Sequence, residues 1–129
     1  MRAAELIGAP LDEWVAKAEG HQGVQVGSRF IVHTRADGFR FADPGAGMHF
    51  APSKQWQQGG PIIAREKLMI EPKLERGGDF YGTWRAVALS FVGRTHSDVN
   101  GPSPLIAAMR CYVQSVFGAD ELPDDPTLP

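Results

Sequence analysis

Two glycine- and proline-rich turns carry the residue types best suited to binding a ligand. Each is predicted to run into a helix start, where unpaired backbone N–H groups and the positive end of the helix dipole attract anions. Glycine lets a ligand approach the backbone, tryptophan offers a stacking surface, and arginine pairs with an anionic group. The candidate ligand-binding residues are Trp56, Gly59, Gly60, Arg65, Gly101, Ser103 and Arg110. An ordinary structural role as turn, cap and core residues is the alternative for all of them.

Motifs for catalysis or metal binding are missing from the sequence. There is no Walker loop and no nucleophile elbow, and Gly45-Ala46-Gly47 is followed by Phe50 where a dinucleotide loop needs a third glycine. The lone Cys111 falls in the middle of a predicted helix, away from the cations that activate a thiol. The four histidines are His21, His33, His49 and His96. No two of them are separated by two or four residues, the spacings expected of a local metal-binding motif. We therefore expect no catalytic residue, no metal and no cofactor, and we favour a protein that is not an enzyme.

The first half of the chain predicts a helix and a hairpin. A helix is expected over residues 10–19, with Pro10 at its first position, Asp12 in its first turn, and an apolar face. That face consists of Leu11, Trp14, Val15 and Ala18. Residues 29–34 and 39–41 are rich in β-branched and aromatic residues and flank Asp37-Gly38, which predicts a hairpin.

The middle of the chain predicts two short helical pieces and two strands. Ser53 is expected to cap a single turn that ends at Trp56, and Gly59-Gly60 is expected to break it. Pro61 is then expected to start a second short helix that ends at Lys67. Strands are predicted over residues 68–71 and 81–91, with a turn around residues 77–78.

The last helix has the clearest signals. Ser103 is a good N-cap, Pro104 suits the first helical position, and Gly118 is expected to end the helix. Its apolar stripe is Leu105, Met109, Tyr112, Val113 and Val116, and its opposite face carries the small residues Ala107, Ala108, Cys111 and Ser115. Small residues on a second face indicate close packing of another element or of a partner subunit. A homo-oligomer formed through Ala107, Cys111 and Ser115 is one expectation, and a plain exposed face is the alternative.

Length and composition limit the class of protein. The chain has 129 residues, enough for one domain, and we predict a single α+β domain over residues 1–118 with about three helices and a small antiparallel sheet. Residues 119–129 are expected to form a flexible, acidic, proline-rich tail. The net charge of -2 argues against a nucleic-acid binder, and no apolar run reaches the ~20 residues of a membrane span. One cysteine and no secretory signal favour the cytoplasm.

Several segments together resemble the NinX-like family of phage and prophage proteins of unknown function. The matching segments are residues 11–20, 51–56, 59–63, Trp84 with Ala86, and residues 101–113. The family often has aspartate before the tryptophan at position 56, where this chain has Gln55. The resemblance implies a phage or prophage gene in a bacterial host, and it implies no activity and no catalytic residue.

Three functions follow as hypotheses. The first is a phage accessory protein that binds a host or phage protein without catalysing a reaction. The alternative is a binder of a small anionic, nucleotide-like ligand at the two glycine/proline turns. A nucleic-acid accessory factor is the third, and it rests on the phage origin more than on the residues.

Overall fold

The computed structural model describes residues 1–20, 50–74, 77–78, 82–89 and 94–123, together with the backbone of residues 32–34 and 40–42. The elements in chain order are η1 (Ala3–Glu5), α1 (Gly8–Ala18), β1 (Val32–Thr34), β2 (Arg40–Ala42), α2 (Trp56–Glu66), β3 (Met69–Pro72), β4 (Trp84–Ala88), β5 (Ser97–Gly101) and α3 (Pro104–Phe117). Helices packed on a small antiparallel sheet confirm the predicted α+β class.

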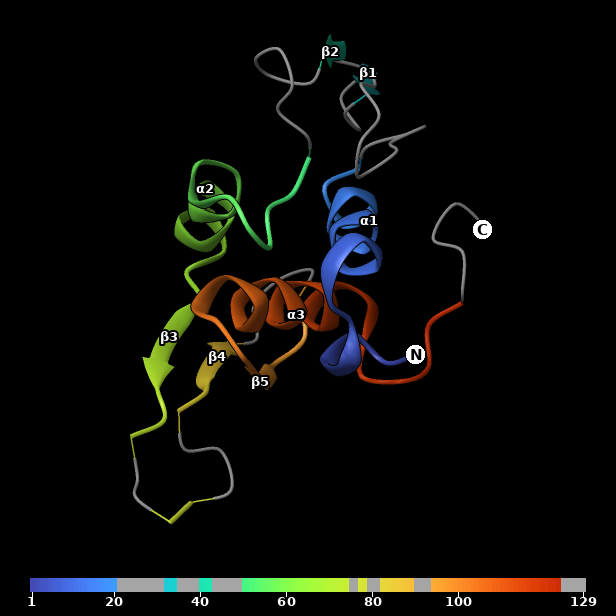
Figure 1. Ribbon diagram of the computed structural model, residues 1–129. Coiled ribbons are helices and arrows are strands. Elements are labelled where there is room, and N and C mark those ends of the chain that lie inside the picture. Colours follow the sequence, from blue (N-terminus) through green and yellow to red (C-terminus); the bar gives the residue numbers. More distant parts are fainter. Residues whose placement is uncertain are drawn as a thin grey trace.

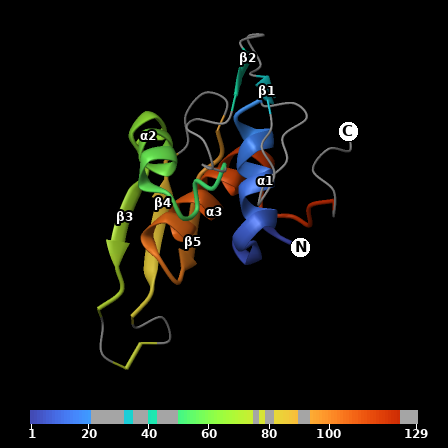
Figure 2. The ribbon, with the colours of Figure 1, turned by 45° about the horizontal axis from the view of Figure 1, so that its top comes forward.

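Helix α3 is the centre of the domain. It runs across the middle, with α1 and α2 on one side and β3, β4 and β5 on the other (Figure 1). The three strands lie in the order β3-β4-β5, and both pairs are antiparallel. Figure 2 shows these strands side by side, with α1 on the opposite side of α3. The core therefore forms around α3, and Ala86 and Val99 are among the strand residues buried in it.

The two best-marked helices form as predicted. On α1, Leu11, Trp14 and Val15 are buried, although the helix begins two residues before Pro10. On α3, the hydroxyl oxygen of Ser103 accepts a hydrogen bond from the N–H of Ile106 at 3.1 Å, and Gly118 follows the last turn. Local capping signals and an apolar face were enough to place both helices.

Helix α2 corrects the prediction of two short helical pieces. It continues without a break through Gly59, Gly60 and Pro61. A Cβ atom on Gly59 would lie 2.5 Å from the carbonyl oxygen of Pro52 and 2.7 Å from a methyl group of Leu105. Gly59 therefore allows a close contact between α2, the preceding loop and α3, and it does not end the helix.

Asp12 and Ser53 also differ from prediction. Asp12 lies in the second turn of α1 and is 2% exposed, so it does not complement the helix dipole at the surface. Its Oδ1 accepts a hydrogen bond from the backbone N–H of Ser53 at 2.9 Å. The N-cap of α2 is Gln55, so Ser53 does not cap this helix. The Asp12–Ser53 contact instead joins α1 to the loop before α2.

Strand β5 was not predicted, and residues 100–101 were assigned to a turn. The structure places Asn100 and Gly101 at the end of β5, paired with Arg85 and Trp84 of β4. A Cβ on Gly101 would lie 2.7 Å from the backbone nitrogen of Ala107. The glycine therefore lets the end of β5 pass close to the first turns of α3.

The small-residue face of α3 is buried within the chain. Ala107, Ala108 and Cys111 are fully buried, Ser115 is 2% exposed, and the Cys111 thiol lies 3.8 Å from the carbonyl oxygen of Ser97 in β5. Because α3 packs against β4 and β5, the close packing that these residues predicted is made by elements of the same chain. A second subunit is not needed to explain the face.

The remaining predictions concern strands and the tail. Strands β3 and β4 confirm the predicted strands, and β1 pairs with β2 as the hairpin prediction requires, with Val32 opposite Ala42. The Asp37-Gly38 turn lies outside the described residues. Part of the expected tail is folded: Leu122 is buried, and its N–H donates to the carbonyl oxygen of Met1 at 3.2 Å. Residues 124–129 of the tail lie outside the described residues.

Candidate functional site

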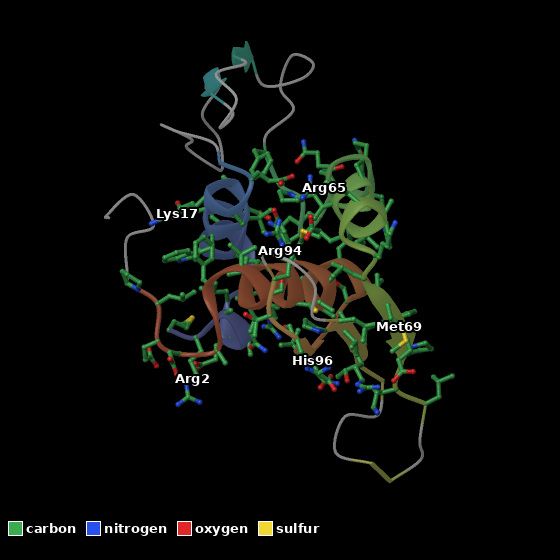
Figure 3. All side chains as sticks on the ribbon, turned by 180° about the vertical axis from the view of Figure 1, so that it is seen from behind. Arg2, Lys17, Arg65, Met69, Arg94 and His96 are labelled. Atoms are coloured by element: carbon green, nitrogen blue, oxygen red, sulfur yellow. The ribbon has the colours of Figure 1, made fainter. Side chains whose placement is uncertain are left out.

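Five side chains from distant parts of the sequence form what we call the arginine cluster: Glu19, Arg65, Glu66, Arg94 and Tyr112. Arg65 binds both carboxylate oxygens of Glu19 at 3.0 and 2.8 Å, and Arg94 binds Glu66 at 2.7 Å. The hydroxyl of Tyr112 donates to Glu19 at 2.9 Å. Figure 3 shows Arg65 and Arg94 between α1 and α2, beside α3. The cluster ties the two outer helices together above α3.

The charges of the arginine cluster balance. Burial alone would raise the pKa of Glu66, but hydrogen bonds from Arg94 and Arg65 outweigh it and hold the pKa below its usual value. Burial alone would lower the pKa of Arg65, and its bonds to Glu19 and Glu66 outweigh that effect and raise it. Two guanidinium groups therefore meet two carboxylates, which leaves no excess positive charge for an anionic ligand.

An open pocket of about 480 Å³ lies beside β5, an outer strand of the three-stranded sheet. It is lined by Ala4, Thr83, Asp98, Val99, Asn100, Gly101, Pro102, Arg110 and Gln114. These residues come from η1, from the residue before β4, from β5, from the turn between β5 and α3, and from α3. The volume is within the range of small-molecule sites in proteins.

Arg110 is the charged group of this pocket that has no acidic partner within the described part of the chain. Its Nε donates to the carbonyl oxygen of Leu6 at 2.7 Å, and its Nη1 donates to the carbonyl oxygen of Asn100 at 2.9 Å. Burial lowers the pKa of Arg110, and no carboxylate among the described residues offsets this effect. Its Nη2 has no acceptor within the described residues. Half-buried cations normally have an anionic partner, because desolvating a charge is costly.

Arg85 shows the contrast. Its Nε and Nη2 bind the two oxygens of Asp98 at 2.9 and 2.6 Å, and its Nη1 binds Glu71 at 2.8 Å. The hydrogen bonds that Arg85 donates to these two carboxylates raise its pKa. Asp98 lines the pocket, and its carboxylate already accepts two hydrogen bonds from Arg85. These bonds lower the pKa of Asp98, although partial burial acts in the opposite direction.

Asn100 supplies a second polar group. Its side-chain amide nitrogen is buried and has no acceptor within the described residues, while its backbone carbonyl oxygen binds Arg110. An unpaired buried amide costs about 1–3 kcal/mol. The torsion that turns an asparagine carboxamide is soft, and this buried donor must rotate before it can reach a ligand in the pocket.

The predicted ligand residues separate into two groups. Gly101 and Arg110 line the pocket, and Ser103 lies just beyond it as the cap of α3. Trp56, Gly59, Gly60 and Arg65 belong to α2 and do not line the pocket. Trp56 is 55% exposed at the first position of α2, and Gly59 is buried against Leu105. Of the two expected helix starts, the one near residue 101 is a helix start, and the one near residue 60 lies inside a helix.

Sequence reasoning missed Asn100, Thr83 and Gln114 as lining residues. The alternation of Ser97, Asp98, Val99 and Asn100 is a period-two pattern that predicts a strand with one polar face. It was obscured by the glycine and prolines that follow. That pattern was the one available signal for Asn100.

Within the described residues, no three His, Cys, Asp or Glu side chains lie close enough together to hold a metal ion. None of the helices in that part of the chain has both the length and the apolar character of a membrane span.

The fold and the pocket define a small α+β domain with a half-buried arginine at a sheet edge. The sequence profile of the family described as "Bacteriophage P22, NinX" matches residues 2–115. Because this match covers most of the 129 residues, the chain belongs to the phage NinX family. The family indicates a phage accessory protein. A search of curated proteins found no match.

Proposed function

We propose that the protein binds a small anionic ligand in the β5 pocket, without catalysing its conversion. The observation that carries this proposal is the half-buried guanidinium of Arg110, which donates to two backbone carbonyls and meets no carboxylate in the described part of the chain. A bound anion would supply the missing charge partner. Charge-assisted hydrogen bonds to arginine are about twice as strong as neutral ones.

The fixed positions of the hydrogen-bond donors in the pocket make it selective for the shape of the ligand. The two carbonyl contacts fix the orientation of the Arg110 side chain, so little rotamer entropy is lost when a ligand binds. The amide of Asn100 offers a second donor beside it. A fixed cation and a neutral donor at one edge of a pocket favour an oxyanion.

The test is thermal unfolding of the full chain with acetate and with inorganic phosphate at matched ionic strength. A ligand present at 100 times its Kd stabilises the folded state by about 2.7 kcal/mol. We expect at least one anion to raise the Tm of the wild type and to have a much smaller effect on Arg110→Gln. Arg65→Gln is the matched control, because it removes the same guanidinium from the arginine cluster on α2.

The two arginine variants separate the possible sites. Loss of the ligand effect in Arg65→Gln, with retention in Arg110→Gln, would move the site to α2 and contradict the proposal. If Arg110→Gln does not fold, Asn100→Ala replaces it: this change removes an unpaired buried donor, so we expect unchanged or higher stability with weaker binding. No anion effect on the wild type would contradict the proposal.

Docking of a host or phage protein is the second candidate function, and exposed apolar side chains favour it. Met69 on the edge strand β3 is 49% exposed, and Leu74 and Leu89, which lie beyond opposite ends of the β3–β4 pair, are each 71% exposed. Figure 3 places Met69 at the outer edge of the sheet. Exposed edge strands offer unpaired backbone groups to another chain.

The docking function is tested by charge substitution. Met69→Lys should abolish recovery of a phage or host protein that binds the wild type. Ile7→Lys is the control, because Ile7 is 53% exposed next to α1, far along the chain from β3. Equal recovery by both variants would place the docking surface elsewhere.

A further inference from the structure

The charges that face the β5 pocket determine how much negative charge a ligand can carry. Among the lining residues the cation is Arg110 and the acid is Asp98, and the polar neutral groups belong to Thr83, Asn100 and Gln114. Arg85 already binds both oxygens of Asp98 and one oxygen of Glu71. Among the described lining residues, Arg110 is therefore the cation without a carboxylate partner, whereas Asp98 and Glu71 share the single charge of Arg85 and together keep one negative charge beside the pocket.

A second negative charge on the ligand meets no further cation among the described residues that line the pocket. Asp98 and Asn100 lie two residues apart on one face of β5, which separates them by roughly 6.6 Å. A phosphate dianion that contacts Arg110 would thus place its second charge within a few ångströms of the Asp98 carboxylate. His96 and Lys73 lower the pKa of Asp98 from a greater distance, and hydrogen bonds from Arg85 dominate that effect.

The uncharged lining points to an organic ligand. Ala4 and Pro102 form the exposed apolar part of the wall beside Arg110, whereas Val99 is 4% exposed and belongs to the core. Burial of apolar ligand surface contributes roughly 25 cal/mol for each Å², so an organic body gains affinity that an inorganic ion cannot. The amide of Asn100 can donate to one oxygen of an oxyanion while Nη2 of Arg110 donates to the other.

We infer that the ligand is a singly charged organic acid, and this inference rests on the proposed anion-binding function. Its carboxylate lies between Arg110 and Asn100, and its apolar part lies against Ala4 and Pro102. Nucleoside polyphosphates and other multiply charged phosphates are rejected because Asp98 faces the same pocket.

The experiment is a chemical-shift titration of the full chain, followed at the backbone amides of Asn100 and Gly101, near neutral pH and at constant ionic strength. The probes are butyrate, acetate, dimethyl phosphate, inorganic phosphate and pyrophosphate. We expect butyrate to bind more tightly than acetate, and both phosphate and pyrophosphate to bind about tenfold more weakly than butyrate. Dimethyl phosphate separates the number of charges from the chemistry of the carboxylate.

Each outcome bears on one of the two proposals. Binding of phosphate or pyrophosphate at least as tight as that of butyrate overturns the inference and leaves anion binding standing. Binding of dimethyl phosphate tighter than that of butyrate overturns the assignment of a carboxylate. Failure of every probe to shift these amides overturns the proposed function itself.

Two carboxylate variants test the role of Asp98 directly. Asp98→Asn should strengthen phosphate binding about fivefold while changing butyrate binding much less, since it removes the charge that repels a dianion. Glu71→Gln is the control, because it removes the other carboxylate bound to Arg85 without lining the pocket. Equal effects of the two variants on phosphate binding would contradict the inference.

Discussion

Replacing Asp12 with asparagine should be more favourable for the stability of the protein at neutral and alkaline pH than in acid. Asp12 is 2% exposed, and its hydrogen bond from the backbone N–H of Ser53 is 2.9 Å long. Burial raises its pKa from 3.8 to about 6, although the hydrogen bond to Ser53 and the charge of Lys54 act in the opposite direction. The ionised carboxylate is thus less stable in the folded chain than in the unfolded chain.

The magnitude follows from the two pKa values. The interval between 3.8 and about 6 corresponds to about 3 kcal/mol, at about 1.36 kcal/mol for each pKa unit. Because the folded-state pKa is raised, the favourable contribution of Asp12 is complete below pH 3.8 and is lost as pH rises through about 6. Asparagine carries no charge at any pH and retains an oxygen that can accept from Ser53.

The assay is urea unfolding of wild type and Asp12→Asn at about pH 3.5 and about pH 8. The new amide group of asparagine has a packing and hydrogen-bonding cost, but that cost does not depend on pH. The difference in unfolding free energy between variant and wild type should therefore move by about 3 kcal/mol in favour of the variant between the two pH values. Glu13→Gln, a neighbouring carboxylate on α1, provides the baseline to subtract.

A change in the opposite direction would refute the reasoning. If the wild type gains stability relative to Asp12→Asn as pH rises, the hydrogen bond from Ser53 outweighs burial and the pKa of Asp12 is lowered. A difference that does not change with pH would show that the carboxylate is solvated equally in the folded and unfolded chains.

Three further predictions concern α3 and its contacts. Ser103→Ala should lower the free energy of unfolding by about 1 kcal/mol because it removes the helix cap, as urea unfolding will show. Gly101→Ala should destabilise the fold by about 1–3 kcal/mol, since the new Cβ meets the backbone of Ala107, whereas Gly60→Ala in open space within α2 should stabilise it by about 0.5–1 kcal/mol. A stable Gly101→Ala variant would contradict the close packing of β5 on α3. The Cys111 thiol, which is buried and has its pKa raised to about 11, should react with iodoacetamide only as fast as the protein unfolds, and rapid alkylation of the folded protein would contradict its burial.

The sequence by itself determined the features that depend on neighbouring residues. A serine cap followed by proline, with apolar residues at helical spacing, was enough to place α3 and to bury its stripe. Strands β3 and β4 followed from short β-branched or aromatic segments, and the α+β class followed from the order of these elements. Such signals act over a few residues, so they can be read without knowing the rest of the fold.

Only the tertiary structure decided the features that depend on distant residues. Gly59 lies inside α2 because Pro52 and Leu105 occupy the space that a side chain would fill, and neither contact can be read from local spacing. Arg65 and Arg110 are both arginines in predicted helices, and their local sequences do not distinguish them. In the described part of the fold, Arg65 meets carboxylates, whereas Arg110 meets backbone carbonyls. Electrostatic environment depends on which groups meet across the fold, and that is why the candidate anion site became visible only there.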